Sequence, residues 1–197
     1  MNATKITAFL VFPLFIGGFL VGEDIIKTIL NEQWYPMITV FKYLCLTQIL
    51  MAINAINNFA HAAQDRPHWG MFYHIAGVLL MPVSFYLAVP YGLNAIIFPW
   101  MSTFVLLCGS WILITLKKIG IPITTYIRNL MTPITASAIM MIMVSAFRYS
   151  LSSYNIIMNN NLIKFILSAG IGGLFYLGCI WFIDRNLILN VKLLRRK

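Results

Sequence analysis

Residues 6–21 read ITAFLVFPLFIGGFLV and contain no charged side chain. The rest of the chain has a similar character, since 60% of its 197 residues are hydrophobic and 10% are charged. Soluble domains average about 45–50% and about 25%, respectively. A soluble all-α domain could not bury this much apolar surface, whereas a membrane protein has lipid as its solvent. The composition therefore predicts an integral membrane protein.

Six apolar segments are long enough, or nearly so, to cross a hydrocarbon core of about 30 Å as helices of about 20 residues. None of them shows the alternation with a period of two that is typical of membrane β-barrel strands. We expect an all-α helical bundle that forms one transmembrane domain over residues 1–197, with residues 184–197 as a basic cytoplasmic tail. The predicted spans are residues 6–21, 36–58, 71–89, 93–116, 130–147 and 162–183.

The positions of the fourteen Lys and Arg residues predict the orientation of the chain. If the N-terminus is cytoplasmic, ten of them fall on the inner side and four on the outer side, in agreement with the positive-inside rule. Both termini are therefore expected in the cytoplasm. The basic residues sit at the ends of apolar segments rather than along one polar face, which indicates membrane topology and not nucleic-acid binding.

The segment NEQWYP, residues 31–36, then lies on the outer face between the first two spans. Trp34 and Tyr35 suit the headgroup zone, and Pro36 suits the first turn of a helix, where its missing N–H costs nothing. The preceding residues 22–30, GEDIIKTIL, have isoleucine and leucine at helical spacing. We expect them to form a short amphipathic helix along the interface, which makes NEQWYP an interfacial elbow.

An apolar span with an internal proline, VFPLFIGGFL, is followed here by an amphipathic turn and then by NEQWYP. This order resembles the C-terminal part of the polysaccharide and O-antigen flippases, which belong to the multidrug/oligosaccharidyl-lipid/polysaccharide exporter superfamily and carry the pattern G-E-K-W-x-P. Glu32, Trp34 and Pro36 stand at the positions of that pattern, whereas Asn31 replaces the usual glycine and Gln33 the usual lysine.

Further motifs follow in the family's order, so that the resemblance covers roughly residues 5–185. AQDRP at residues 63–67 is similar to the family's A-x-G-R-P: it retains Arg66 and Pro67 and has Asp65 where glycine is usual. YGLNA at residues 91–95 matches Y-G-[IL]-x-[GA], and a long span with a basic loop comes next. Each motif is weak by itself, and the resemblance depends on their order and spacing.

The resemblance implies a transporter in the bacterial cytoplasmic (inner) membrane. It would flip an undecaprenyl-diphosphate-linked oligosaccharide from the inner to the outer leaflet for O-antigen, as in lipopolysaccharide, or for another surface polysaccharide. Flipping makes and breaks no bond, so the chain is not expected to be an enzyme or to hold a catalytic residue, cofactor or metal. Family members are usually about twice as long or more, with two pseudo-symmetric halves. The chain is therefore expected to correspond to the last six helices, working with a separate N-terminal half or a second copy.

Two alternatives stay open at this point. The first is a related exporter of drugs or of a peptidoglycan precursor. The second is a membrane-bound acyltransferase or polymerase of the same glycan pathway. His61 and Asp65 are one residue short of the H-x4-D pattern of glycerolipid acyltransferases, and the outer connection at residues 148–161 is short for a polymerase. The chain contains no H-E-x-x-H, G-x-S-x-G or phosphate-binding loop, and its cysteine spacing matches no metal site.

Polar residues within the second span indicate where a substrate could pass. At 100° per residue, several of them fall within about 40° of one another on one face of a helix. Such a stripe could contact sugar hydroxyls, or it could hydrogen-bond to neighbouring helices. The stripe ends at Asp65, and we take four of its residues together with a nearby lysine as the candidate substrate path: Thr47, Asn54, Asn58, His61 and Lys42.

Two sets of basic residues have both a functional and a topological interpretation. Lys42 could attract a diphosphate as a compact point charge, or its long side chain could extend to the headgroups. Arg148 is expected to anchor the outer end of the fifth predicted span. On the inner side, four basic residues could receive an anionic lipid-linked donor, although topology alone already accounts for them: Arg66, Lys117, Lys118 and Arg128.

Overall fold

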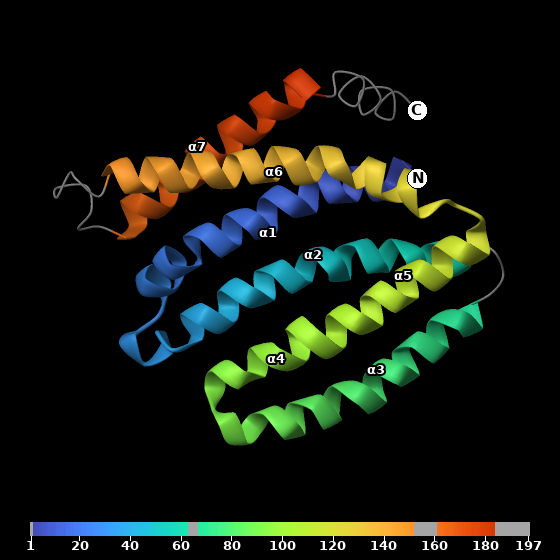
Figure 1. Cartoon of the computed structure of the whole chain (residues 1–197). Helices are drawn as coiled ribbons and strands as arrows, with labels where there is room; N and C mark the ends of the chain where they lie inside the picture. The colour runs from blue at the N-terminus through green and yellow to red at the C-terminus, as the bar shows by residue number, and fades with distance from the viewer. Residues whose placement is uncertain (1, 63–66, 152–160, 184–197) are drawn as a thin grey trace.

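The computed structural model describes residues 2–62, 67–151 and 161–183, and these residues form helices without any strand (Figure 1). Six helical segments are long and apolar enough to cross a membrane, which confirms the expected all-α class. The division into one domain and a tail stays a prediction, and the tail lies outside the described residues. The elements are α1 (Asn2–Ile29), η1 (Glu32–Trp34), α2 (Met37–Ala62), α3 (Pro67–Ala88), η2 (Val89–Tyr91), η3 (Leu93–Ile96), α4 (Ile97–Pro99), the π-helical η4 (Trp100–Phe104), α5 (Val105–Ile119), α6 (Ile123–Leu151) and α7 (Asn161–Ile183).

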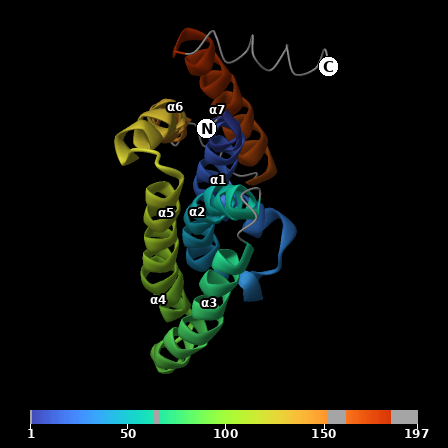
Figure 2. The same cartoon turned by 90° about the vertical axis from the view of Figure 1, so that its right-hand side faces the viewer.

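Helix α1 occupies the centre of the arrangement, with α2 on one side and α6 and α7 on the other (Figures 1 and 2). Helix α5 packs against α2, and α3 lies at the edge beside α4 and α5. Only 6% of the apolar window of α3 is buried within the described chain, against 33% of that of α2. Most of the surface of α3 is therefore left for lipid or another protein to cover.

Two clusters of buried apolar side chains hold the long helices together. The first joins α1, α2, α5 and α6 and consists of Ala8, Phe12, Ile49, Ile53, Leu116 and Tyr126. The second joins α6 and α7, with Phe9, Ile16 and Leu20 of α1 packed against it, and consists of Ala136, Met140, Val144 and Tyr176. Helix α1 contributes to both, which explains its central position.

A glycine at position 22 allows the close contact between α1 and α2. A Cβ atom at Gly22 would lie 2.8 Å from Cδ1 of Phe41 on α2, which is closer than carbon atoms can approach. Small residues at such positions let membrane helices come close enough for extensive van der Waals contact.

Pro13 interrupts the backbone hydrogen bonds of α1, and a side chain from α7 compensates. Proline has no N–H, so the carbonyl oxygen of Phe9, four residues earlier, loses its partner within the helix. The hydroxyl of Tyr176 donates a hydrogen bond to this oxygen at 2.8 Å. The rings of Phe9 and Tyr176 also pack at a centroid distance of 5.6 Å. The proline therefore creates an acceptor that fixes α7 against α1.

The end of α1 differs from the sequence-based expectation. Residues 22–29 continue α1 without a break, whereas a separate interfacial helix was predicted there. The helical spacing of isoleucine and leucine in residues 22–30 led to that prediction, but these residues extend α1, and basic partners neutralise Glu23 and Asp24, as described below. The helix ends at Ile29, and Glu32–Trp34 form a 3-10 turn just before α2.

The elbow residues lie at the end of the bundle where α1 passes into α2, and all of them are exposed except Tyr35, which is half-buried (Figure 1). The turn is closed by backbone hydrogen bonds from Trp34 N–H to the carbonyl of Asn31 and from Tyr35 N–H to that of Glu32, at 2.9 and 3.0 Å. Trp34 is 45% exposed, and Pro36 directly precedes α2. These positions agree with an interfacial role, which stays a prediction.

The motif YGLNA forms the turn between α3 and α4. Gly92 has a φ of +88°, a left-handed conformation that glycine adopts without steric cost. Its N–H donates to the carbonyl of Val89, and its carbonyl accepts from Ala95 N–H, both at 3.1 Å. The glycine of this motif is therefore required by the backbone.

Candidate functional site

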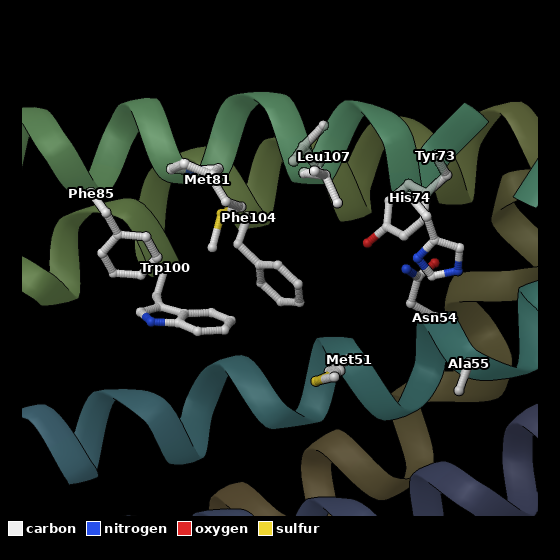
Figure 3. A pocket seen from close by; sticks show the side chains of 13 residues that line it. Met51, Asn54, Ala55, Tyr73, His74, Met81, Phe85, Trp100, Phe104 and Leu107 are labelled. Atoms are coloured by element: carbon white, nitrogen blue, oxygen red, sulfur yellow. The ribbon is translucent and has the colours of Figure 1, made fainter. Parts of the chain in front are cut away.

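A cavity of about 550 Å³ lies between α2, α3 and the segment from η4 to α5 (Figure 3). It falls within the range of about 300–1,000 Å³ that is usual for small-molecule sites. The cavity extends along the helices, with different side chains at its two ends. It is lined by Met51, Asn54, Ala55, Tyr73, His74, Gly77, Val78, Met81, Pro82, Phe85, Trp100, Phe104 and Leu107.

One end of the cavity is aromatic. Trp100 contacts Phe85 and Phe104 edge-on, at ring-centroid distances of 6.1 and 5.2 Å. The π-helical segment η4 begins at Trp100 and directly follows the buried Pro99. Segments of π-helix are rare in proteins, and those that occur are often found at functional sites. The local backbone thus places Trp100 and Phe104 on the side of the chain that faces α3 and α2.

The other end of the cavity carries its polar groups, which are Asn54, Tyr73 and His74 (Figure 3). Tyr73 is already engaged, because its hydroxyl lies 3.3 Å from the Sγ of Cys108 and its ring stacks on Trp111 at 5.2 Å. Asn54 is 4% exposed, and its Oδ1 has no hydrogen-bond partner among the described residues. The cavity therefore ends at a buried carbonyl oxygen that can accept a hydrogen bond.

The structure treats the members of the predicted polar stripe differently. Asn54 reaches the cavity, whereas Thr47 is 1% exposed and its hydroxyl bonds to the carbonyl of Leu44 in its own helix at 2.8 Å. Residues 63–66, which include Asp65 and Arg66, lie outside the described part of the chain. The same holds for the side chains of Asn58, His61 and Pro67. Their roles stay predictions.

Lys42 takes part in a group of ion pairs where α1 meets α2 and α6. Its Nζ lies 3.2 Å from Oε2 of Glu23, and Lys27 Nζ binds Oε1 of the same carboxylate at 2.7 Å. All three side chains are partly exposed. Two cations thus share one carboxylate, which leaves a net positive charge at this position. The place of Lys42 on a substrate path is not tested by this geometry.

Arg148 forms a third ion pair in this region, with Asp24, and ties α6 to α1. Its guanidinium donates to both carboxylate oxygens of Asp24, at 2.6 and 3.3 Å, and also to the carbonyl of Leu20 at 3.1 Å. Asp24 is 3% exposed. The expectation that Arg148 serves as an interfacial anchor did not include this partner, which lies 124 positions away in the sequence.

A second, smaller cavity of about 370 Å³ lies between α1, α6 and α7. It is bordered by small residues on α1 and α7, and Ser168 is a polar residue among otherwise apolar side chains. The two cavities lie on opposite sides of the α1–α2 contact. Among the described residues, no group of three or more histidine, cysteine or acidic side chains could hold a metal ion.

Sequence reasoning selected Asn54, which lines this cavity, for a substrate path that stays a prediction, and it missed the residues that face Asn54. Tyr73, Trp100 and Phe104 carry no motif, and aromatic residues within apolar spans are common. The π-helical turn had no sequence signal beyond the proline before it. The cavity depends on three segments that meet only in the folded chain.

The chain is 27% identical over 181 residues to the teichuronic acid biosynthesis protein TuaB of Bacillus subtilis (strain 168). The matched region covers 90% of this chain but 36% of TuaB, so the chain spans about a third of the length of this curated relative. No protein-family model and no solved structure matches the chain. The described molecule is thus a multi-pass helical membrane protein that is similar, over most of its length, to a protein of polysaccharide biosynthesis.

Proposed function

We propose that this bundle forms part of a transporter that moves a lipid-linked oligosaccharide across the bacterial cytoplasmic membrane during surface polysaccharide synthesis. The similarity to TuaB over 90% of the chain supports this proposal most strongly. The six apolar helices provide the membrane setting. O-antigen is the polysaccharide class implied by the motif resemblance, and the substrate would be linked to undecaprenyl diphosphate.

Transport by alternating access requires two helical units that move relative to each other. The described bundle would form one wall of the pathway. Further residues of a longer polypeptide, a separate chain or a second copy would form the other. The lipid tail would stay in the bilayer while the sugars cross between the walls. No bond is made or broken, so the protein would act without catalytic residues or a cofactor.

Two positively charged regions would guide the diphosphate. Lys117 and Lys118 lie at the end of α5, and Arg128 in the first turns of α6 is exposed near them. Lys118 also lies over the ring of Trp69, with its Nζ 3.2 Å from the centroid. At the other end of the bundle, the surplus positive charge of Lys42 and Lys27 around Glu23 would attract the diphosphate after crossing.

A complementation assay tests this function. A strain without the chain should lose the surface polysaccharide and accumulate lipid-linked oligosaccharide that an external glycosidase cannot reach in spheroplasts. The wild-type chain should restore both. Lys42→Gln should reduce export on the order of tenfold, as expected for loss of one hydrogen bond to a charged group.

Lys164→Gln is the matched control, because it also removes one positive charge but lies on α7, outside the two positively charged regions. It should leave export near the wild-type rate. Glycosidase-accessible precursor in the deletion strain would contradict a flipping role. Unchanged polysaccharide together with increased drug sensitivity would favour a drug exporter instead.

A further inference from the structure

The cavity between α2, α3 and α5 contains an acceptor that the described protein leaves unused. Asn54 is more than nine-tenths buried, and its Oδ1 has no hydrogen-bond partner within residues 2–62, 67–151 and 161–183. A buried carbonyl without a donor is costly, especially within a bilayer where water is scarce. No described residue donates to this oxygen, and the hydroxyl of the neighbouring Tyr73 lies 3.3 Å from the Sγ of Cys108. A ligand with a donor group would satisfy this oxygen.

The lining of the cavity indicates that the ligand is uncharged. None of its thirteen residues is Lys, Arg, Asp or Glu. A phosphate, carboxylate or ammonium group would have to give up its water without gaining a counter-charge. A lipid-linked diphosphate therefore does not fit here, and this inference goes beyond the transport function proposed above and does not depend on it.

The shape and chemistry of the lining indicate a long apolar body with a single polar end. Away from Asn54, the cavity is formed by aliphatic side chains, by Met51 and Met81, and by the aromatic group at Trp100. Methionine adapts its flexible side chain to irregular apolar partners. A sugar ring has hydroxyls on all sides, and most of them would find no partner here. A hydrocarbon ligand with one terminal hydroxyl matches both ends of the cavity.

We propose that this cavity binds an uncharged single-chain amphiphile of the class of long-chain or isoprenoid alcohols. The hydroxyl of the ligand donates to Oδ1 of Asn54, and its hydrocarbon body extends past Met81 to Trp100. Helix α3, which forms one wall of the cavity, has little of its surface buried within the described residues, so we expect a ligand to enter beside it from the membrane.

Gly77 provides a way to fill the cavity without disturbing the helices. It lines the cavity on α3, and a Cβ atom placed there would meet no atom within 4 Å. A phenylalanine at this position therefore has room in the cavity and excludes a ligand. Gly109 on α5 also has open space at its Cβ but does not line the cavity. Gly109→Phe is thus the matched control.

The test uses the purified full chain in nanodiscs of phosphatidylglycerol and phosphatidylethanolamine. The probes are a photoreactive C16 alcohol and its methyl ether, which differ only in the donor hydrogen. Labelled peptides are mapped by mass spectrometry. We expect labelling of the cavity residues of α3 and η4, with the alcohol preferred about three- to tenfold, as one neutral hydrogen bond provides. Gly77→Phe should abolish this labelling and Gly109→Phe should preserve it.

Asn54→Leu should still label but lose the preference for the alcohol over the ether. The comparison of the two probes on the wild-type chain requires no variant, so the result stands even if a variant fails to fold. Equal labelling by both probes would overturn the proposal. So would cavity labelling that persists in Gly77→Phe, or labelling spread over the lipid-facing surface, which would mean that another helix or ordinary lipid covers the cavity.

Discussion

Replacing Arg148 with glutamine should lower the free energy of unfolding by about 3 kcal/mol, because it leaves the buried carboxylate of Asp24 without a counter-charge. Removing one partner of a buried ion pair typically costs about 3–5 kcal/mol. We take the lower value because the Arg148 side chain is 30% exposed, whereas that of Asp24 is 4% exposed. SDS titration in mixed micelles, followed by circular dichroism, measures the change.

Lys27→Gln is the control for this measurement. The Lys27–Glu23 pair joins positions i and i+4 of the same helix, and the two side chains are 34% and 39% exposed. Such pairs contribute about 0.3–0.5 kcal/mol. The double variant Asp24→Asn with Arg148→Gln should recover part of the lost stability, since no bare charge remains. Equal small effects for Arg148→Gln and Lys27→Gln would show that the α1–α6 ion pair is not formed.

Replacing Tyr176 with phenylalanine should destabilise the bundle by about 2 kcal/mol, within the range of about 1–3 kcal/mol for a buried acceptor that loses its donor. The acceptor is the carbonyl of Phe9, which cannot bond to residue 13 because that residue is proline. No water within the bilayer replaces the lost hydroxyl. The same SDS titration reports the change.

A double-mutant cycle with Pro13→Ala separates this explanation from a simple packing effect. Alanine at position 13 restores an N–H that bonds to the carbonyl of Phe9 within α1. In the Pro13→Ala background, Tyr176→Phe should therefore cost less than about 0.5 kcal/mol, the usual limit for a substitution that breaks no specific interaction. An equal cost in both backgrounds would contradict the role assigned to the proline.

The amino-acid sequence predicts the fold class well, because its six long apolar segments can satisfy their backbone hydrogen bonds within lipid as helices. It predicts the end of α1 incorrectly. The amphipathic spacing of residues 22–30 predicts a separate interfacial helix, but these residues continue α1, and the partners of Glu23 and Asp24 lie on α2 and α6 as well as in α1. The pairing of Asp24 with Arg148 spans 124 positions, and no local pattern contains that information.

The candidate site shows the same limit. Helical periodicity placed Thr47 and Asn54 on one face of the second span, and both are indeed buried. Periodicity does not tell which helix faces a residue. Thr47 satisfies its hydroxyl within α2, whereas Asn54 meets a cavity whose other walls come from α3 and α5. Trp100 enters that cavity from a π-helical turn, which depends on backbone geometry rather than on composition.

The arrangement of the bundle across the membrane underlies the proposed transport and can be measured directly. In a background with Cys45, Cys108 and Cys179 replaced by alanine, single cysteines are placed at two exposed positions, as Gln33→Cys in the elbow and Lys117→Cys at the end of α5. A membrane-impermeant maleimide added to spheroplasts should label Gln33→Cys at once and Lys117→Cys only after permeabilisation. The reverse pattern, or labelling of both positions from outside, would contradict the account.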